Sequence, residues 1–230
     1  MRIYTKTGDK GSSSLYSGER VSKGNRIFSV LGELDRLNCD LGFIRSFRKN
    51  VECIGGIKSI QDLLIRIGSC IGTRPTNRKR YEQTRIRNLD SETKELEACI
   101  DDWTTRLPPL TTFLTPGDSE HSTRVHAART TCRSLERLIV SLCDDIKEET
   151  VDIQKSIDDA RADSLNESTL EKEINDLVKL YDDSVTLLSD LRDVAKYINR
   201  LSDYLFTLAR YVEERSEVSD SWWGNFSVGF

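Results

Sequence analysis

Apolar residues recur every three or four positions over five long segments of the chain, and polar residues fill the positions between them. This spacing places the apolar residues on one face of an α-helix. The five segments run at about 26–47, 57–71, 91–106, 119–145 and 187–214. The pattern therefore predicts five amphipathic helices that bury their apolar faces against one another in an all-α bundle.

The positions predicted to be buried are those that keep the helical spacing within each segment. They are Val30, Leu34, Leu37, Leu41 and Ile44, then Ile57, Ile60, Leu64, Ile67 and Ile71, then Leu96, Cys99, Ile100 and Trp103, then Val125, Ala128, Cys132, Leu135, Ile139 and Leu142, and finally Leu191, Val194, Ile198, Leu201, Leu205, Leu208 and Val212.

The remaining segments divide the chain into three parts. Residues 1–25 form an N-terminal segment in which Ser12 to Tyr16 is a short extended piece from which no sheet is expected. Residues 26–215 form the bundle, with a charged insertion at about 146–186. The first half of that insertion is predicted to be either mobile or an exposed helix extension, and its second half has a weak helical stripe. The tail, residues 216–230, is rich in aromatic residues and is expected to dock onto this subunit or a neighbour.

Composition narrows the class of partner. The net charge is -4 and charged residues make up 31% of the 230 positions, which argues against a protein that binds duplex nucleic acid. A local basic run at 74–87 fits a solvated loop better than a phosphate site. No stretch is apolar enough to cross a bilayer, and no signal peptide opens the chain. We therefore expect a cytoplasmic protein, or one of the mitochondrial matrix if a transit peptide has been removed.

Cysteine and histidine spacing predicts no metal site. None of the six cysteines forms a C-x-x-C pair, so reduced, mostly buried thiols are expected. The two histidines, His121 and His126, have no second ligand at metal spacing and are interpreted as structural.

The N-terminal segment has the composition of a polyphosphate site. Its glycines allow tight turns and close backbone approach, and its lysines and hydroxyl groups would contact phosphate. The spacing is not that of a Walker A loop. A flexible leader would have the same composition, so both readings stand on this segment alone. The run reads Thr5, Lys6, Thr7, Gly8, Asp9, Lys10, Gly11, Ser12, Ser13 and Ser14, with Lys23 after it.

Two further groups of polar residues lie on predicted helices. Arg129, Arg133 and Arg137 are spaced four apart with Glu136 among them, which is either a binding face or a surface ion-pair stripe. Asn199 lies four residues before Asp203. Its amide either hydrogen-bonds to adenosine or forms a polar pair with Asp203 on the helix surface. Phe113 follows a double proline and is either a wall for a flat ligand or a core anchor.

Four motifs in order resemble one family. They are Tyr4–Gly11 with Gly18-Glu19-Arg20 and Lys23, Leu107–Leu110 with Phe113, Arg129–Arg137, and Asn199–Phe206. Together they resemble the PduO-type ATP:cob(I)alamin adenosyltransferases. The resemblance implies a five-helix bundle assembled as a homotrimer with active sites between subunits. It also implies transfer of the 5′-deoxyadenosyl group of ATP to the cobalt of cob(I)alamin, with Mg²⁺ sharing the charge of the phosphates and triphosphate leaving.

The resemblance also implies residue roles. Catalytic roles fall to Asp35, Arg129 and Phe113, with Arg129 paired to Asp35 across a subunit boundary and Phe113 helping to displace the lower axial base of the corrinoid. The ATP-binding positions are Thr5, Lys6, Thr7, Gly8, Ser13, Ser14, Lys23, Arg133, Glu136, Arg137 and Asn199. A cobalamin reductase and an adenosylcobalamin-dependent mutase would be partners of such an enzyme.

The chain departs from the family pattern at Arg36, Ser134 and Asp118, and by its charged insertion. The departures bear on substrate affinity and on the loop at the corrinoid side more than on the ATP side. A cobalamin carrier with little turnover is the alternative function, and a plain helical scaffold is a third.

Overall fold

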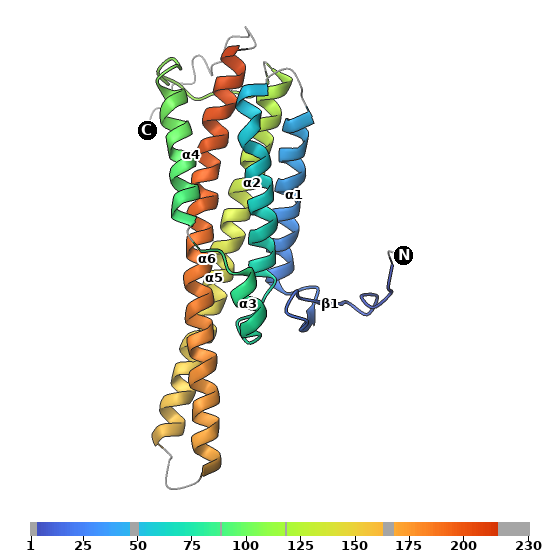
Figure 1. Cartoon of the computed structure of the whole chain (residues 1–230), viewed down its shortest axis with the longest axis vertical. Helices are drawn as coiled ribbons and strands as arrows, with labels where there is room; N and C mark the ends of the chain where they lie inside the picture. Colours follow the sequence, from blue (N-terminus) through green and yellow to red (C-terminus); the bar gives the residue numbers. More distant parts are fainter. Residues whose placement is uncertain (1–3, 47–50, 88, 118, 163–167, 216–230) are drawn as a thin grey trace, which may run out of the picture. The chain divides into compact units, whose positions relative to one another are not determined.

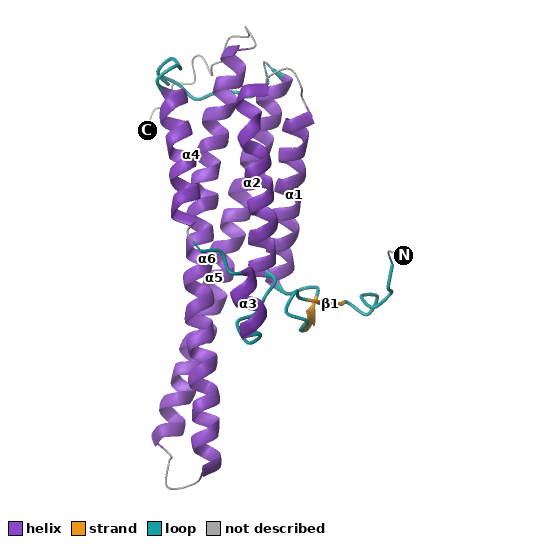
Figure 2. Cartoon of the chain, in the orientation of Figure 1, coloured by secondary structure: helices purple, strands orange, loops and turns teal. Residues whose placement is uncertain are grey.

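The computed structural model describes residues 4–46, 51–87, 89–117, 119–162 and 168–215. Along these residues lie β1 (Ser12–Ser14), β2 (Arg20–Ser22), α1 (Arg26–Ser46), α2 (Val51–Ile71), α3 (Arg78–Thr84), α4 (Leu89–Thr104), α5 (Glu120–Ala162) and α6 (Ser168–Arg215). Figure 2 shows that helix dominates the described chain. The long helices α1, α2, α4, α5 and α6 are the five that the hydrophobic pattern predicts, so the all-α prediction is confirmed.

Polar side chains fix where two of the long helices begin. The Asn25 side chain accepts a hydrogen bond from the backbone N–H of Ile27 at 3.0 Å, just before α1. The Ser119 hydroxyl accepts from the N–H of Ser122 at 3.4 Å, just before α5. Such residues satisfy the N–H groups that have no partner within the first turn of a helix.

The described chain forms two compact units, and each is assembled from three separate stretches. Unit 1 comprises Met1–Gly32, Arg66–Arg87 and Arg137–Ala195. Unit 2 comprises Glu33–Ile65, Asn88–Glu136 and Lys196–Phe230. Helices α1, α2, α5 and α6 each contribute residues to both units without a break in the helix.

Unit 2 is built around stripes contributed by five helices. Leu37 and Leu41 of α1, Leu64 of α2, Leu135 of α5 and Leu201 of α6 have no measurable exposure. Burying one such side chain stabilises the fold by about 1.5–3 kcal/mol. On α4, Trp103 is buried and stacks on Tyr211 with ring centroids 5.4 Å apart. The stripes predicted from the sequence therefore form the core, although Cys99 and Ile100 of α4 are only half-buried.

Unit 1 contains the ends of α5 and α6 that face each other as an antiparallel pair, seen in Figure 1 where α5 ends at Ala162 and α6 begins at Ser168. Ile153 and Ile157 of α5 are buried, as are Leu187 and Leu191 of α6. The first half of the charged insertion is thus a helix extension up to Ala162, which was one of the two readings of that segment.

The prediction that no sheet forms is wrong. β1 and β2 pair antiparallel in a two-stranded sheet, with Ser12 opposite Ser22 and Ser14 opposite Arg20. The strands are three residues long, so they show no alternation that a sequence pattern could detect.

The tail 216–230, with Trp222 and Trp223, lies outside the described residues, and so does Asp118. Docking of the tail therefore stays a prediction. No helix within the described ranges combines the length and the apolar character that crossing a membrane requires.

Candidate functional site

The N-terminal segment of unit 1 is an ordered turn followed by a hairpin. The Asp9 N–H donates to the Lys6 carbonyl at 3.4 Å, and the Gly11 N–H donates to the Gly8 carbonyl at 3.2 Å. Gly11 has a φ of 78°, a conformation that glycine adopts without steric cost. Lys6 has a φ of 59°, which is uncommon for a residue with a side chain and marks a strained position in a candidate binding loop.

Arg20 ties this turn to the hairpin. Its Nη2 atom donates to the carbonyl of Thr7 at 2.8 Å and to the carbonyl and hydroxyl oxygens of Ser12 at 3.3 and 2.5 Å. One guanidinium thus holds the start of the loop against β1. Arg20 belongs to the first of the four family motifs, from which no role for it was predicted. Its hydrogen bonds show a structural role, which is to hold the turn against the hairpin.

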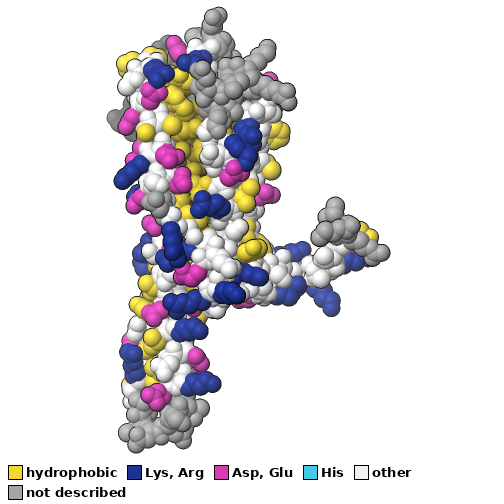
Figure 3. Space-filling view, in the orientation of Figure 1, with side chains coloured by type: hydrophobic (Ala, Val, Ile, Leu, Met, Phe, Trp, Pro, Cys, Tyr) yellow, Lys and Arg dark blue, Asp and Glu magenta, His cyan; other side chains and the backbone are white. Residues whose placement is uncertain are grey.

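Lys23 lies across the turn formed by residues 6–11, the glycine turn. Its backbone N–H donates to the Gly11 carbonyl at 2.9 Å. Its Nζ lies 3.0 Å from the place that a Cβ on Gly8 would occupy, so the ammonium rests directly over that glycine. Lys6, Lys10 and Lys23 are all exposed, and Figure 3 shows Lys and Arg side chains gathered along the N-terminal segment. The turn therefore presents positive charge, hydroxyl groups and an open backbone at Gly11, which suits a polyphosphate.

The hairpin is attached to the residues that follow α2. The Ser17 N–H donates to the Gly72 carbonyl at 3.3 Å. The Asn77 side chain donates to the Ser17 carbonyl at 3.1 Å, and Arg80 Nη1 donates to the Tyr16 carbonyl at 2.5 Å. The Arg80 guanidinium also lies 5.3 Å from the centre of the Tyr16 ring.

These contacts correct the interpretation of the basic run at 74–87 as a solvated loop. The run contains α3, whose Asn77 cap accepts from the Arg80 N–H. Tyr81 of α3 is buried, and the Arg85 guanidinium pairs with Asp190 of α6. The signal that could have revealed this helix is Asn77 followed four residues later by Tyr81, an aromatic residue within the otherwise polar stretch 76–85.

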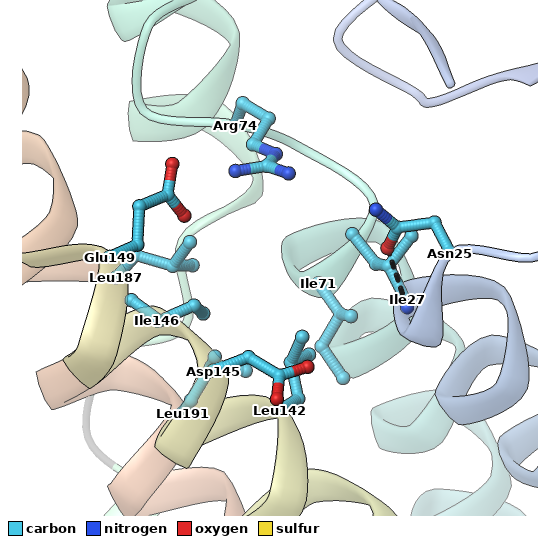
Figure 4. A pocket seen from close by; sticks show the side chains of 10 residues that line it. All are labelled: Asn25, Ile27, Ile71, Arg74, Leu142, Asp145, Ile146, Glu149, Leu187 and Leu191. Atoms are coloured by element: carbon cyan, nitrogen blue, oxygen red, sulfur yellow. Dashed lines mark hydrogen bonds between the residues drawn. The ribbon is translucent and has the colours of Figure 1, made fainter. Parts of the chain in front are cut away.

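Unit 1 also contains a cavity of about 90 Å³. Figure 4 shows Arg74 and Asn25 on its polar side, opposite the carboxylates of Asp145 and Glu149. Its apolar wall is formed by Ile27, Ile71, Leu142, Ile146, Leu187 and Leu191. None of the candidate site residues lines it, so the predicted ATP positions and this cavity are separate features of the unit.

In unit 2, two candidate ATP residues contact each other directly. The Asn199 side-chain N–H of α6 donates to Glu136 Oε1 of α5 at 2.8 Å. Asn199 is exposed and Glu136 is half-buried, so both are accessible from one surface. Asp203 pairs instead with Arg200 at 2.8 Å. Two candidate ATP positions therefore lie in contact within this unit, and their role in binding ATP stays a prediction.

Arg133 and Arg129 differ in environment although they are one helical turn apart. Arg133 is exposed, whereas Arg129 is half-buried and its guanidinium lies 5.9 Å from the centre of the Phe206 ring. Burial, and secondarily the charge of Arg133, lower the pKa of Arg129. Arg129 Nε has no hydrogen-bond partner within the described chain. A buried guanidinium N–H needs an acceptor, which water, a ligand or another protein group can supply.

Asp35 and Phe113 are both exposed, and Phe113 at 88% is the most exposed large apolar residue in the described chain. The alternative that Phe113 is a core anchor is therefore wrong for the single chain. The loop that carries it is held on one side, where Arg210 Nη2 donates to the Pro108 carbonyl at 2.6 Å. Pairing of Asp35 with Arg129 across subunits stays a prediction.

The candidate site residues are distributed between the two units. Unit 1 holds Thr5, Lys6, Thr7, Gly8, Ser13, Ser14, Lys23 and Arg137, and unit 2 holds Asp35, Phe113, Arg129, Arg133, Glu136 and Asn199. In the part of the chain that the structure describes, no group of three or more His, Cys, Asp or Glu side chains is arranged to hold a metal ion.

Comparison with known proteins decides the family. The sequence profile of the cobalamin adenosyltransferases matches residues 3–166 and 169–212. The chain belongs to the cobalamin adenosyltransferase family. The matched ranges include the N-terminal turn, the α5 arginines and Asn199.

Individual family members show how far the similarity reaches. The chain is 33% identical to the corrinoid adenosyltransferase MMAB of Bos taurus over 213 residues, which is 91% of this chain and 70% of that protein. It is 31% identical to the corrinoid adenosyltransferase PduO of Citrobacter freundii, of which it spans 49%. A variant of the PduO-type ATP:corrinoid adenosyltransferase from Lactobacillus reuteri, complexed with cobalamin and ATP, superposes with a TM-score of 0.71 at 26% identity. The superposition covers 97% of the present chain and 100% of the Lactobacillus reuteri chain.

Proposed function

We propose that the chain transfers the 5′-deoxyadenosyl group of MgATP to the cobalt of cob(I)alamin, giving adenosylcobalamin and triphosphate. The observation that carries the proposal is the family match together with the exposed lysines and hydroxyl groups around the Gly8 turn. The names of its relatives and the ligands of the Lactobacillus reuteri structure support it. The protein is then a transferase, with ATP and a reduced corrinoid as its substrates.

The chemistry is a nucleophilic displacement at carbon. The electron pair of Co(I) forms a bond to C5′ of ATP, the C5′–O bond breaks, and its electron pair leaves with triphosphate. The leaving group is highly charged, so cations and backbone donors that hold it in line lower the barrier. With MgATP as substrate, Mg²⁺ would share the charge of the phosphates with Lys6 and Lys23.

On the ATP side, the residues of the glycine turn hold the phosphates. Lys6 and Lys23 neutralise charge, and the Thr5, Thr7, Ser13 and Ser14 hydroxyls donate. Arg133 and Arg137 add two guanidiniums, which bind phosphate oxygens in bidentate fashion. Asn199 and Glu136, already joined by a hydrogen bond, read the nucleoside.

On the corrinoid side, Phe113 forms a wall against the macrocycle and helps displace the lower axial base. Removing that ligand makes the cobalt easier to reduce. The 88% exposure of Phe113 leaves the ring free to do so.

Assembly as a homotrimer, with active sites between subunits, completes the proposal. The unsatisfied Arg129 Nε and the exposed Asp35 are compatible with a pair that forms only between two copies. We also propose a reductase as the source of Co(I) and an adenosylcobalamin-dependent mutase as the user of the product. Localisation in the cytoplasm or the mitochondrial matrix is part of the same proposal, and the free thiols of Cys39, Cys70, Cys99, Cys132 and Cys143 suit either compartment.

The test is an anaerobic incubation of cob(I)alamin with MgATP, followed by the absorbance change that accompanies formation of the Co–C bond. The expected result is adenosylcobalamin and triphosphate in equal amounts. Tight corrinoid binding without product would favour the carrier function instead, and binding of neither substrate would leave only a helical scaffold.

A further inference from the structure

Asp190 is a buried carboxylate of unit 1 that the proposed chemistry does not use. It lies on α6 with 8% of its surface exposed. It accepts a hydrogen bond from the Tyr81 hydroxyl at 2.5 Å and two from the Arg85 guanidinium, each at 2.8 Å. A buried carboxylate needs such donors, and their geometry is fixed in return because leaving it unpaired is costly.

The two donors to Asp190 hold their protons more firmly than free side chains do. Burial is the main cause that raises the pKa of Tyr81, and the hydrogen bond to Asp190 adds to it. The same hydrogen bonding raises the pKa of Arg85. Tyr81 therefore remains a donor and Arg85 a cation at neutral pH.

Asp190 fixes the place of α3. This helix has seven residues, too few to be stable alone, so its position depends on tertiary contacts. Tyr81 and Arg85 are one helical turn apart and both bind Asp190. They anchor the C-terminal half of α3 to α6.

The N-terminal end of α3 holds the N-terminal hairpin. Asn77 and Arg80 donate to the carbonyls of Ser17 and Tyr16, the residues at the hairpin turn. Within the hairpin only Leu15 is fully buried, at 4% exposure. With so little apolar area buried, the orientation of the hairpin depends on these polar contacts.

The hairpin in turn holds the glycine turn. Arg20 of β2 binds the carbonyl of Thr7, and the Lys23 N–H binds the carbonyl of Gly11. A continuous chain of hydrogen bonds thus runs from Asp190 through α3 and the hairpin to the turn that carries Lys6 and Gly8.

We propose that Asp190 is a positioning residue for ATP, which it serves by fixing α3 and, through Asn77 and Arg80, the phosphate-binding turn. The inference rests on the proposed function of that turn. It predicts that the loss of Asp190 weakens the use of ATP and leaves the use of the corrinoid intact.

The first measurement separates the two substrates. With Asp190→Asn, the KM for MgATP should rise about fivefold or more, the low end of the range for coupled sites. The KM for cob(I)alamin should stay unchanged. Arg85→Lys keeps the cation beside Asp190 and should recover part of the loss seen with Arg85→Ala. An equal rise in both KM values would overturn the proposal, because it would indicate general destabilisation.

The second measurement does not depend on activity. Hydrogen exchange of the ligand-free protein should be faster at the amides of Leu15, Ser17 and Gly18 in Asp190→Asn than in the wild type. Unchanged exchange at these three amides would also overturn the proposal. If the wild-type protein neither turns over nor binds ATP, the proposed function fails, and the exchange result still decides whether Asp190 orders the hairpin.

Two variants serve as controls. Glu213→Gln alters another buried carboxylate of α6, one that accepts from the Ser122 hydroxyl at 2.6 Å in unit 2. It should lower the Tm without changing the ratio of the two KM values. Asn77→Asp keeps the acceptor that caps α3 and removes the donor to Ser17, so it should reproduce the ATP-selective defect even if Asp190→Asn does not fold. A normal KM for MgATP in Asn77→Asp would contradict the proposed route.

Discussion

The side chains of Glu136 and Asn199 are joined by a hydrogen bond of 2.8 Å between α5 and α6. Both are proposed to bind ATP. In the ligand-free protein the Asn199 amide uses one of its donors on Glu136, and Glu136 uses one of its acceptors on Asn199. A nucleotide that binds between them must match the same pattern of donor and acceptor, since an amide and a carboxylate offer different groups.

The variant Asn199→Asp tests this pairing. It replaces the donor with a second carboxylate, so repulsion from Glu136 should separate the side chains and raise the KM for MgATP roughly tenfold, equivalent to about 1.4 kcal/mol. Adding Glu136→Gln restores a donor opposite the new carboxylate and should recover part of the loss. The measurement is steady-state kinetics of the two single variants and the double variant, and strictly additive effects would argue against a shared role.

Arg133→Ala should impair ATP use far more than stability. Arg133 is exposed, so the Tm should change little, while loss of a phosphate contact should raise the KM for MgATP by roughly tenfold or more. Arg124→Ala is a matched control, because Arg124 is an exposed arginine of the same helix that pairs with Glu120 at 3.6 Å. Comparable losses of activity and Tm in Arg133→Ala would mean that Arg133 is structural.

Gly11→Ala should distort the phosphate turn. Gly11 has a φ of 78° and open space around it, so the alanine side chain meets no neighbour but strains the backbone by about 1 kcal/mol. The expected result is weaker MgATP binding in calorimetry. Gly24→Ala places a methyl group 3.6 Å from the Ser22 hydroxyl, an ordinary contact, and should bind MgATP normally. Identical affinities in the two variants would show that the turn geometry is unimportant.

Phe113→Ala should affect the corrinoid step alone. The exposure of this ring means that its loss removes little packing, so the Tm should be within about 1–2 °C of the wild type. Formation of four-coordinate cobalt, followed by absorbance in the presence of MgATP, should decrease strongly, while the affinity for MgATP stays the same. Leu110→Ala, at a neighbouring residue that is 44% exposed, is the control for loss of apolar surface. A defect of equal size in both variants would remove the specific role of the ring.

His126 makes stability depend on pH. Burial, and secondarily the Arg129 charge, lower the pKa of His126 from 6.5 to about 4. The unfolded chain therefore binds a proton between these values that the folded chain does not, so stability is full above about pH 6.5 and falls as the pH drops towards 4. His126→Gln should flatten this part of the curve of unfolding free energy against pH. An unchanged slope in His126→Gln would disprove the assignment.

The hydrophobic pattern predicts the five long helices because each carries a stripe of residues with helical spacing. Those stripes are buried except at Cys99 and Ile100 of α4. The pattern did not predict α3 or the hairpin. Tyr81 is held by Asp190, 109 positions away, and no local spacing reveals such a partner. The strands are fixed by Arg20 and by contacts with Gly72 and Asn77, which are tertiary and not local.

The candidate site followed from ordered motifs and not from spacing alone. Glu136 and Asn199 could be named from these motifs, and their contact is present in unit 2. Asn77, Arg80 and Asp190 could not be named, because their relation to the phosphate turn exists only through α3. The exposure of Phe113 likewise could not be read from its neighbours in the sequence.

The uninterrupted passage of α1, α2, α5 and α6 through both units has a consequence for synthesis on the ribosome. Unit 1 needs residues up to Ala195, and the core of unit 2 needs α6 as far as Val212. Neither unit can complete its packing until most of the chain has emerged from the ribosome. The apolar faces of α1 and α2, which are synthesised first, therefore stay exposed to water until then. Such exposure invites aggregation, and we expect the nascent chain to depend on chaperones more than a bundle of sequentially stacked hairpins would.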